Sequence, residues 1–583
     1  MERKGPTVEF GFGFSVADSE IPRAPGLQIL VIAELWGTGA SSARINDAED
    51  LDGLIAAIAP ELALFIDPSP FAASEPVRVR LAPKSMADLK PASLVGQVPA
   101  LSALAELSRH LGTAREPASD NVASALQQCR QHPALGALAV RWGQALAALA
   151  QRPAAAADQD HAQPPEREPD GKKSGVDRIL GMVAAPAAGS ASDHPAGAVA
   201  GGAQRAGIQR SGASLAAIRD EVDGALAALL TALLHHPQVI ALEATLRGLR
   251  FLRSRVREGL DVTVIDRGDE PLAQLLDATL SAAPAAGAGG GFDLALIEGP
   301  FGNNAADLER LRHLAEAAEL AQVPTIVALA SEFLDTPQGW PASLRVLGES
   351  PALIGWQALR RRPCARWLVA TFNPFLGRLP HQTKDPSYRE PEQRATLAWA
   401  QPGWLLLERV LIGTAAHGLP VGFAGRSAGC VDGLDLWETN GVQIPLRYAL
   451  TPEQTADLAD LGIMAPSCEP NRDRAYLLDV PSALATPPAS NSERDRVTRR
   501  MTRLDFQLLA AHLARLIEGL RRRLEPSLST ADKAEALRGR LTQQLGTHDA
   551  RVQVQTTDAG VEVTVNLGGY GLAGVPITLH VPV

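Results

Sequence analysis

Apolar and polar residues alternate along several short segments in the first 150 residues of the chain. Val77–Leu81 (VRVRL) is apolar at every second position, and residues 61–66 also read as a strand. A period of two is typical of a β-strand with one buried face. Residues 27–35 (LQILVIAEL) form a mostly apolar run of strand length, which predicts a strand buried on both faces. A helix over residues 50–58, capped by Asp50, separates these strands, so this block predicts mixed α and β structure.

A longer block, from residue 214 to residue 583, alternates between helical and strand-like patterns. It predicts helices over 215–234, 241–255, 307–321 and 501–524, and strands over 260–266, 292–297 and 323–330. Strands that alternate with helices indicate a partly parallel sheet covered by helices. A terminal hairpin over 552–555 and 561–565 closes the chain. The predicted fold class is α/β (α+β), with mixed sheets covered by helices.

The segment between these blocks, residues 152–213, is rich in Ala, Gly, Pro, Gln and Ser. Such a composition buries too little apolar area to offset the entropy of ordering, so the segment is predicted to be a disordered linker. A flexible coil of about 60 residues has a root-mean-square span of roughly 45 Å. The sequence therefore predicts two folded regions, 1–151 and 214–583, joined by this linker.

One apolar island interrupts the linker, at Val176, Ile179, Leu180 and Val183. These residues could form the apolar face of a helix of about two turns. Because so short a helix is unstable alone in water, we expect it to form only when a partner binds it.

Composition narrows the function classes. The chain has 583 residues, is 46% hydrophobic and carries a formal net charge of −10. Its length predicts two or more domains, and its acidity argues against nucleic acid as the main partner. The short basic clusters at 360–362 and 521–523 are interpreted as solvated or salt-bridged surfaces. No apolar run reaches the roughly 18 residues that a membrane span needs, so we expect a soluble cytoplasmic protein without membrane insertion.

Residues that could support catalysis or metal binding are scattered. The glycines of EGPFGNN (Gly299, Gly302) and of 425–433 match no phosphate-loop or nucleophile motif, and tight turns explain them better. His235 and His236 are adjacent, so capping of a helix C-terminus is a simpler role than metal binding. The four cysteines (Cys129, Cys364, Cys430, Cys468) lack ligand spacing and are expected to be buried as small apolar residues. We expect no catalytic residue, cofactor or metal.

The passage from 77 to 111 resembles the signature of the small sheath subunit of bacterial type VI secretion systems, "sMdDF.P..l..qvpaL..Ll..r..l". The matching residues are Ser85, Met86, Asp88, Leu89, Pro91, Leu94, Val98, Pro99, Leu101, Leu104 and Leu107.

The block after residue 214 resembles the large sheath subunit of the same systems, in the family's order. The family's "L..iLHhPefq.LE..WRGL.yL" is similar to Leu233, His235, His236, Pro237, Leu242, Glu243, Arg247, Gly248, Leu249 and Leu252, with Leu246 in place of its tryptophan. Further matches are 296–301, Leu397, Trp399, Gly418, Gly425, Gly429, Gly433, Pro445, Thr451, Gly462, Arg503 and His512. The resemblance implies that both subunits are fused in one chain.

This resemblance implies a structural part rather than an enzyme, with a contractile-tail-sheath-like fold. The chain would polymerise with itself as a helical tube around an inner tube protein (Hcp-like), start at baseplate proteins and contract. Sheath families join protomers by strand exchange, and exposed terminal strands could supply it. The candidates are Val8, Phe10, Phe12, Phe14, Val552, Val554, Val561, Val563 and Val565. An AAA+ disassembly ATPase (ClpV-like) would recognise the island of Val176, Ile179, Leu180 and Val183.

Two alternatives remain open at this stage. A phage-tail-like contractile injection sheath protein would share the architecture, although such proteins lack the paired signatures above. An uncharacterised α/β enzyme is the other alternative, but no set of nucleophile, base and orienting group can be assembled from the sequence.

Overall fold

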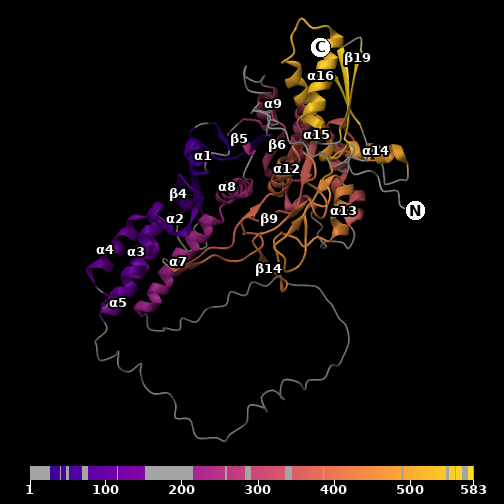
Figure 1. Cartoon of the computed structure of the whole chain (residues 1–583). Coiled ribbons are helices and arrows are strands. Elements are labelled where there is room, and N and C mark those ends of the chain that lie inside the picture. The colour runs from indigo at the N-terminus through magenta and orange to yellow at the C-terminus, as the bar shows by residue number, and fades with distance from the viewer. Residues whose placement is uncertain are drawn as a thin grey trace, which may run out of the picture. The chain divides into compact units, whose positions relative to one another are not determined.

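The computed structural model (Figure 1) separates into two compact units. Unit 1 contains residues 1–70, 76–102 and 227–583, and unit 2 contains residues 71–75 and 103–226. Both sequence blocks contribute to both units. The structure describes residues 27–39, 41–46, 51–67, 76–114, 116–117, 119–151, 214–256, 259–268, 270–281, 291–334, 344–384, 387–486, 492–546, 550–557, 560–567 and 576–581.

A seven-stranded sheet forms the centre of unit 1. Its strand order is β16-β8-β7-β6-β1-β5-β2. All neighbouring strands are parallel except β2, which runs antiparallel to β5 at one edge. The strands are β16 (Ile463–Met464), β8 (Leu368–Thr371), β7 (Thr325–Leu329), β6 (Leu294–Phe301), β1 (Gln28–Ala33), β5 (Asp261–Asp266) and β2 (Ser42–Ile45).

Strand β1 confirms the prediction that its apolar run is buried on both faces. Ile29, Leu30, Val31 and Ile32 are all fully buried. Side chains of a strand alternate between faces, so a run without polar residues suits a strand covered on both sides.

Helices cover both faces of this sheet. On one face, α9 (Leu272–Ser281), α10 (Ala305–Ala321) and α11 (Ile354–Arg360) contribute to a core that includes Leu30 and Ile32 of β1. Helix α12 (Gly403–His417) packs on the other face, where Gly403 lies against Leu296 of β6 and Ile326 of β7.

The N-terminal block adds a hairpin and helices. Helix α1 (Leu51–Ile58) precedes the hairpin of β3 (Leu62–Ile66) and β4 (Val77–Leu81). After this hairpin and the 3-10 helix at 86–89 come two helices, α2 (Pro91–Gln97) and α3 (Pro99–Thr113). Proline has no N–H to continue a helix, which accounts for the break at Val98.

Unit 2 contains the C-terminal part of α3, α4 (Asp120–Gln131), α5 (Gly136–Ala150) and the N-terminal part of α7 (Leu215–Leu234). Glu221 of α7 accepts hydrogen bonds from Arg141 Nη2 at 2.8 Å and from Trp142 Nε1 at 3.2 Å. The buried Trp142 ring therefore has its polar edge satisfied, while Ser108 of α3 bonds Asp223 of the same helix α7.

The C-terminal part of unit 1 is a small three-stranded sheet packed on helices. Strands β19 (Ala550–Thr557), β20 (Gly560–Leu567) and β21 (Ile577–Val581) form an antiparallel sheet with β20 in the middle. It shares a core with α15 (Leu504–Arg521) and α16 (Thr530–Leu545). The predicted hairpin is present, and the predicted helix over 501–524 begins at Leu504, after a separate α14 (Glu493–Met501).

The other regular elements connect these layers. They are α8 (Pro237–Arg255), α13 (Pro452–Asp460), β9 (Phe375–Leu376), β10 (Gln382–Lys384), β11 (Ser387–Arg389), β12 (Trp399–Ala400), β13 (Cys430–Val431), β14 (Trp437–Thr439), β15 (Val442–Ile444), β17 (Ser467–Cys468), β18 (Ala475–Tyr476) and the 3-10 helices η2 (Met86–Leu89), η4 (Ser331–Leu334), η5 (Leu344–Glu349), η6 (Pro351–Leu353) and η7 (Pro363–Trp367).

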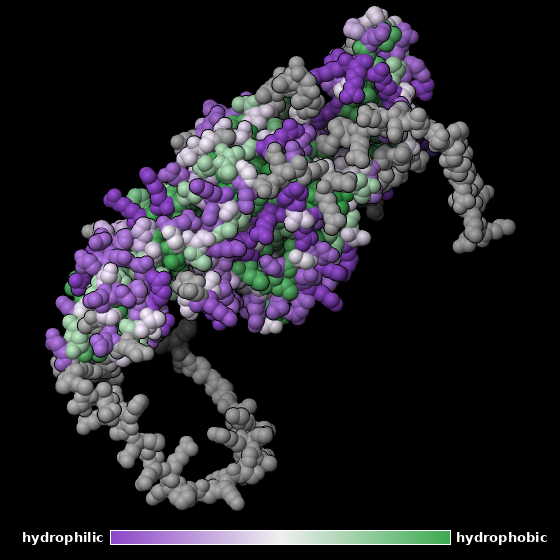
Figure 2. Space-filling model, turned by 60° about the vertical axis from the view of Figure 1, so that its left-hand side comes forward, coloured by the Kyte–Doolittle hydropathy of each residue, from purple (hydrophilic) through white to green (hydrophobic). Residues whose placement is uncertain are grey.

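The surface in Figure 2 is largely hydrophilic, with smaller hydrophobic areas between the polar residues. Within the described ranges, no single helix is long and apolar enough to cross a membrane. The pair α7 and α8 meets that length and composition test only when taken together, and the two helices are bent by 62° at the break between them.

Candidate functional site

The place where the two sequence blocks meet is the middle of the large sheet. Strand β1, from the N-terminal block, pairs along its full length with β5 and along four residues with β6, both from the C-terminal block. It therefore has no free edge. The N-terminal block supplies a central strand of the sheet rather than a part packed on its surface.

Asp293, just before β6, fixes the start of β1. The Gln28 backbone N–H donates to Asp293 Oδ2 at 2.7 Å, and the Asp293 backbone N–H donates to the Gln28 carbonyl at 2.7 Å. On its other side, Asp293 Oδ1 lies 3.2 Å from His512 Nδ1 and accepts a hydrogen bond from Arg515, both on α15. This carboxylate thus connects β1, β6 and α15.

The charge of Asp293 is stabilised despite its burial. Burial by itself would raise the pKa of this carboxyl, but the hydrogen bond from His512 and the charge of Arg515 outweigh it and hold the pKa below its usual range. The carboxylate therefore stays ionised at neutral pH.

Two further carboxylates hold β1 and β2 to β5. Asp266, at the end of β5, accepts from the backbone N–H groups of Leu35 at 2.8 Å and Gly37 at 2.6 Å. Asp261, at its start, accepts from Arg44 Nε of β2 at 2.6 Å. Both ends of β5 are thus bonded to the N-terminal block.

A buried cluster of charges joins α8, and the histidine before it, to the segment from residue 378 to residue 390. Arg378 donates to Glu243 Oε1 at 2.7 Å and to both Glu390 oxygens, at 2.6 and 3.0 Å. Arg247 reaches Glu243 Oε1 at 3.1 Å and His235 Nε2 lies 3.1 Å from Glu390 Oε1. Because Arg378, Glu243 and Glu390 are each under 8% exposed, a lost partner would leave a buried charge less well compensated.

The cluster changes the acidity of its members. Burial opposes ionisation of Glu390, but hydrogen bonds from His235 and Arg378 lower the pKa of Glu390 to about 2. His381 donates its backbone N–H to Glu390 Oε2 at 2.7 Å. Burial and the charge of Arg378 lower the pKa of the His381 ring to about 4, so the ring is neutral at pH 7.

The sequence indicated only part of this cluster. His235, Glu243 and Arg247 belong to the quoted family motif, whereas Arg378 and Glu390 were missed because they lie in irregular segments without a periodic pattern. The capping role predicted for the histidine pair is wrong. His236 begins the next helix instead, accepting from the Gln238 N–H at 3.4 Å as the N-cap of α8.

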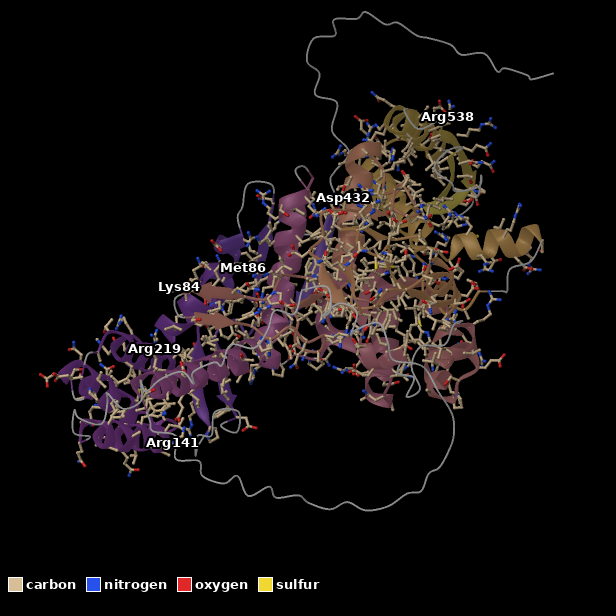
Figure 3. All side chains as sticks on the ribbon, turned by 90° about the horizontal axis from the view of Figure 1, so that it is seen from below. Lys84, Met86, Arg141, Arg219, Asp432 and Arg538 are labelled. Carbon is tan, nitrogen blue, oxygen red and sulfur yellow. The ribbon has the colours of Figure 1, made fainter. Side chains whose placement is uncertain are left out.

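The small-subunit signature corresponds to a tight turn after β4. Asp88 Oδ2 accepts from the backbone N–H groups of Lys84 at 2.8 Å and Ser85 at 2.9 Å. Met86, within this turn, is buried at 7% exposure. Figure 3 labels Lys84 and Met86. The Ser-Met-x-Asp pattern is therefore explained by local backbone capping.

Close packing of two helices explains why the WRGL-like motif has glycine at position 248. A Cβ added to Gly248 of α8 would lie 2.1 Å from Trp404 Cε2 of α12. The Trp404 side chain is fully buried, so it has little room to move. Glycine at this position lets α8 and α12 approach closely.

The C-terminal strand candidates lie on two strands with different surroundings. Val561, Val563 and Val565 of β20 are buried in the core with α15 and α16. Val552 and Val554 of β19 are half-buried, and within the described residues β19 pairs only with β20. Strand exchange through these residues stays a prediction.

Two sets of candidates lie outside the residues that the structure describes. They are the N-terminal strand residues Val8, Phe10, Phe12 and Phe14, and the linker island of Val176, Ile179, Leu180 and Val183.

Several smaller expectations can be compared with the structure. Gly425 and Gly433 have φ values of 99° and 64°, as the turn interpretation requires. That interpretation is wrong for Gly299, whose φ is 104°, because it lies within β6 at an irregularity of the pairing with β7. Of the four free cysteines, Cys129 and Cys364 are buried as predicted, but Cys430 and Cys468 are only half-buried. In the part of the chain that the structure describes, no three His, Cys, Asp or Glu side chains are grouped so that they could hold a metal ion.

The surface interpretation of cluster 360–362 is wrong for its first residue. Arg360 is 5% exposed and donates to the carbonyls of Ala483 at 3.1 Å and Asp460 at 2.8 Å. By contrast, Arg521 forms an ion pair with Glu518 at 2.7 Å, as a salt-bridged surface predicts.

Comparison with known proteins gives two family matches in separate regions. Residues 40–133 match the family model described as type VI secretion system, VipA. Residues 287–483 match the model of the VipB (EvpB) tail sheath N-terminal domain. The two regions follow one another in a single polypeptide, in the order that the two signatures predicted.

Two individual proteins are similar to parts of this chain. The type VI secretion system sheath protein TssC1 of Pseudomonas aeruginosa is 25% identical over 305 residues, which cover 46% of this chain and 61% of that protein. A chain of the anti-feeding prophage baseplate, solved by cryo-EM, is also similar, with 12% identity and a TM-score of 0.29, covering 57% of this chain and 74% of that one.

Proposed function

We propose that this chain, which joins a small and a large sheath-subunit region in one polypeptide, is a structural subunit of a contractile type VI secretion sheath. It polymerises as a helical tube around an inner tube and drives that tube through the cell envelope by contracting. The placement of β1 carries the proposal. A strand of the small-subunit block pairs on both sides with strands of the large-subunit block, so the folded unit is a built-in heterodimer.

Fusion suits this function for a physical reason. A tether fixes the one-to-one ratio of the two regions and makes their association intramolecular, at a high effective concentration. Helical growth additionally needs contacts that do not close into a ring. Strand exchange between neighbouring subunits supplies such contacts, with the segment of Val8, Phe10, Phe12 and Phe14 as donor and the exposed edge of β19 as acceptor.

The partners follow from this assembly. They are further copies of the chain, an Hcp-like inner tube protein, baseplate proteins and a ClpV-like AAA+ ATPase that recognises the linker island and recycles the contracted sheath. Contraction needs no catalytic residue in this chain, because the energy is stored in interfaces between rigid subunits. The sheath works in the cytoplasm and does not insert into a membrane.

Electron microscopy of the purified chain, mixed with its inner tube protein, tests the proposal. Tubes with regular cross-sections are expected, whereas discrete particles that never polymerise contradict the sheath function.

The strand donor is tested in the same assay. Phe10→Asp and Phe12→Asp are expected to abolish tubes while the subunit stays folded, because a charge on the paired face opposes strand addition. Glu9→Gln, on the alternate face of the same segment, is the matched control and should still polymerise. Normal tubes from the Phe10 and Phe12 variants would rule out this segment as the donor.

ATPase recognition is tested by pull-down with the cognate hexamer. Leu180→Asp is expected to abolish capture, because it places a charge on the apolar face of the island. Ala187→Asp introduces the same charge outside the island and should leave capture unchanged. Equal capture of both variants would remove the island as the recognition element.

A further inference from the structure

Two arginines of unit 1 stack on a shared group of aromatic rings, and together they form an arginine–aromatic patch. The guanidinium carbon of Arg394 lies 5.3 Å from the centre of the Trp437 ring and 5.6 Å from that of Tyr448. The guanidinium carbon of Arg447 lies 5.9 Å from the centres of both the Trp399 and the Tyr448 rings. Cations are attracted to ring faces within about 6 Å, so the rings help to hold both guanidinium groups in place.

Short strands and hydrogen bonds fix the patch at the periphery of unit 1, where Figure 1 labels β14. Trp399 of β12 and Trp437 of β14 meet edge to face, with ring centres 5.5 Å apart. Trp399 Nε1 donates to the Arg394 carbonyl at 2.8 Å, and Trp437 Nε1 donates to the Leu446 carbonyl at 2.8 Å. Arg394 Nη2 donates to Thr439 Oγ1 at 3.1 Å. The polar edges of both indoles are therefore satisfied, and the rings are held in one arrangement.

Neither arginine of the patch has a carboxylate partner among the described residues. Arg394 is exposed and Arg447 is half-buried, and Arg447 Nε is buried without a hydrogen-bond partner within the described ranges. Arg426 provides a contrast in the same chain. It stacks on Tyr476 at 5.5 Å and also pairs with Glu469 at 2.7 Å. The patch thus has two positive charges that the described part of the fold does not compensate.

The carboxylates nearest along the chain do not supply this compensation. Glu392 pairs with Arg389 at 3.8 Å. Glu438 is the middle residue of β14, so its side chain points to the face of the strand opposite Trp437. Asp435 is exposed and forms no ion pair with either arginine of the patch. The missing negative charge would therefore have to come from another molecule.

We propose that the arginine–aromatic patch binds an acidic segment on the surface of a second copy of this chain. Stacking covers the flat faces of a guanidinium, but the N–H groups lie in its plane and can still donate. A carboxylate fits these donors because its two oxygens accept two N–H bonds from one guanidinium. Each copy has 65 Asp and Glu residues against 55 Lys and Arg residues, so every copy carries surplus carboxylates.

The composition of the patch suits a protein interface. Trp, Tyr and Arg are the residues that most often dominate binding energy at such interfaces. Side chains that are already held in place lose little freedom when a partner binds. A patch on one copy that binds a different surface of the next copy makes a heterologous contact, which helical growth requires. The inference rests on the proposed self-assembly and adds to it a salt-sensitive contact that is separate from strand exchange.

Sedimentation velocity of the full chain, without the inner tube protein, tests the inference. Self-association is expected at about 50 mM sodium chloride and should weaken at least about tenfold at about 500 mM, because salt screens exposed charges. Added hexaglutamate should compete with self-association, since it supplies free carboxylates. Hexaglutamine is the matched control and should not compete. Equal competition by the two peptides would overturn the inference.

Substitutions of the arginines make the test specific. Arg394→Gln and Arg447→Gln are each expected to raise the dissociation constant of self-association about tenfold. Arg394 is exposed, so its substitution should leave the chain folded and decides the test if Arg447→Gln unfolds it. Arg426→Gln is the matched control. Its arginine is 73% exposed and also stacks on a tyrosine, but it is already paired with Glu469, so self-association should be unchanged.

Parental self-association in Arg394→Gln would overturn the inference, as would a parent chain that stays monomeric up to about 100 µM at low salt. Equal losses in Arg394→Gln and Arg426→Gln would overturn it too, because they would show attraction to general positive charge. These outcomes leave the sheath function standing if tubes form with the inner tube protein. Absence of tubes in that assay contradicts the sheath function even where self-association depends on Arg394.

Discussion

Arg378 is the residue on which the buried charge cluster depends. It is 7% exposed and bonds two carboxylates, Glu243 and Glu390, that are 1% and 3% exposed. A buried ion pair adds little net stability compared with apolar residues of the same size, but removing one partner leaves the others charged and unpaired. The cluster is therefore sensitive to single substitutions.

Arg378→Met is expected to lower the free energy of unfolding by about 3–5 kcal/mol, because two buried carboxylates lose the cation that they share, leaving Glu243 with Arg247 and Glu390 with His235. Urea unfolding followed by circular dichroism measures the change. Arg389→Met is the matched control, since Arg389 is 78% exposed and its ion pair with Glu392, at 3.8 Å, lies at the surface. It should change stability by less than about 1 kcal/mol. Equal effects of the two substitutions would contradict the importance of burial.

Acid should destabilise the fold through the same cluster in two steps. The His381 ring has a pKa of about 4 in the folded chain against an ordinary 6.5, so the unfolded chain binds its proton first and stability falls as pH drops from 6.5 toward 4. Glu390, with a pKa lowered from 4.5 to about 2, contributes stability that is complete above pH 4.5 and is lost below it. The urea concentration at the midpoint of unfolding, measured at pH 7, 6 and 5, follows the loss of stability that His381 causes.

His381→Gln cannot titrate and is expected to flatten this loss between pH 7 and pH 5. His580→Gln changes a histidine that is 76% exposed, and it should leave the dependence of stability on pH as it is in the parent chain. An unchanged slope in His381→Gln would show that other groups cause the acid sensitivity.

At the scale of elements, close helix contacts depend on small residues. Helix α8 approaches α12 where Gly248 faces the Trp404 ring, and an added Cβ would lie 2.1 Å from that ring. Interiors are densely packed, so an extra methyl group must displace its neighbours.

Gly248→Ala is expected to destabilise the fold by about 1–3 kcal/mol through overpacking. Gly539→Ala, in α16, meets no atom within 4 Å and should instead stabilise it by up to about 1 kcal/mol, because alanine favours the helix. Thermal unfolding of both variants provides the comparison. Stabilisation by both substitutions would mean that the α8–α12 contact is loose.

Many elements could be predicted from the sequence, but their pairing could not. The limits of β4 and α7 were predicted to the residue, because their apolar periods are regular. The neighbours of β1 were not predictable, since an apolar run indicates burial without naming the partner strand. Arg378 and Glu390 were missed for a related reason. Arg378 is 135 residues from its partner Glu243, Glu390 is 155 residues from its partner His235, and only the folded chain brings them together.

At the scale of the whole molecule, the two sequence regions are expected to depend on each other for folding. Residues 1–151 and 214–583, produced as separate chains in the same cell, should associate and copurify, because β1 completes a sheet that otherwise has unpaired β5 and β6 edges. Affinity purification through a tag on one fragment measures this. Fragment 214–583 alone is expected to aggregate.

For this experiment, the same change from valine to aspartate is made at two positions of fragment 1–151, one buried and one exposed. Val31→Asp puts a charge into the buried centre of β1 and is expected to abolish copurification. Val140→Asp makes the same change at a side chain that is 48% exposed and should be tolerated. Independent folding of fragment 214–583 would contradict the interdependence of the two regions.

The central position of β1 also sets an order of events during synthesis. This strand leaves the ribosome early, yet Asp261, which bonds the Gln28 side chain, follows 233 residues later. At translation rates of roughly 5–20 residues per second, β1 waits about 10–50 s for the strands on either side of it. During that time a mostly apolar strand has both edges open, so the nascent chain should require protection by chaperones until β6 emerges.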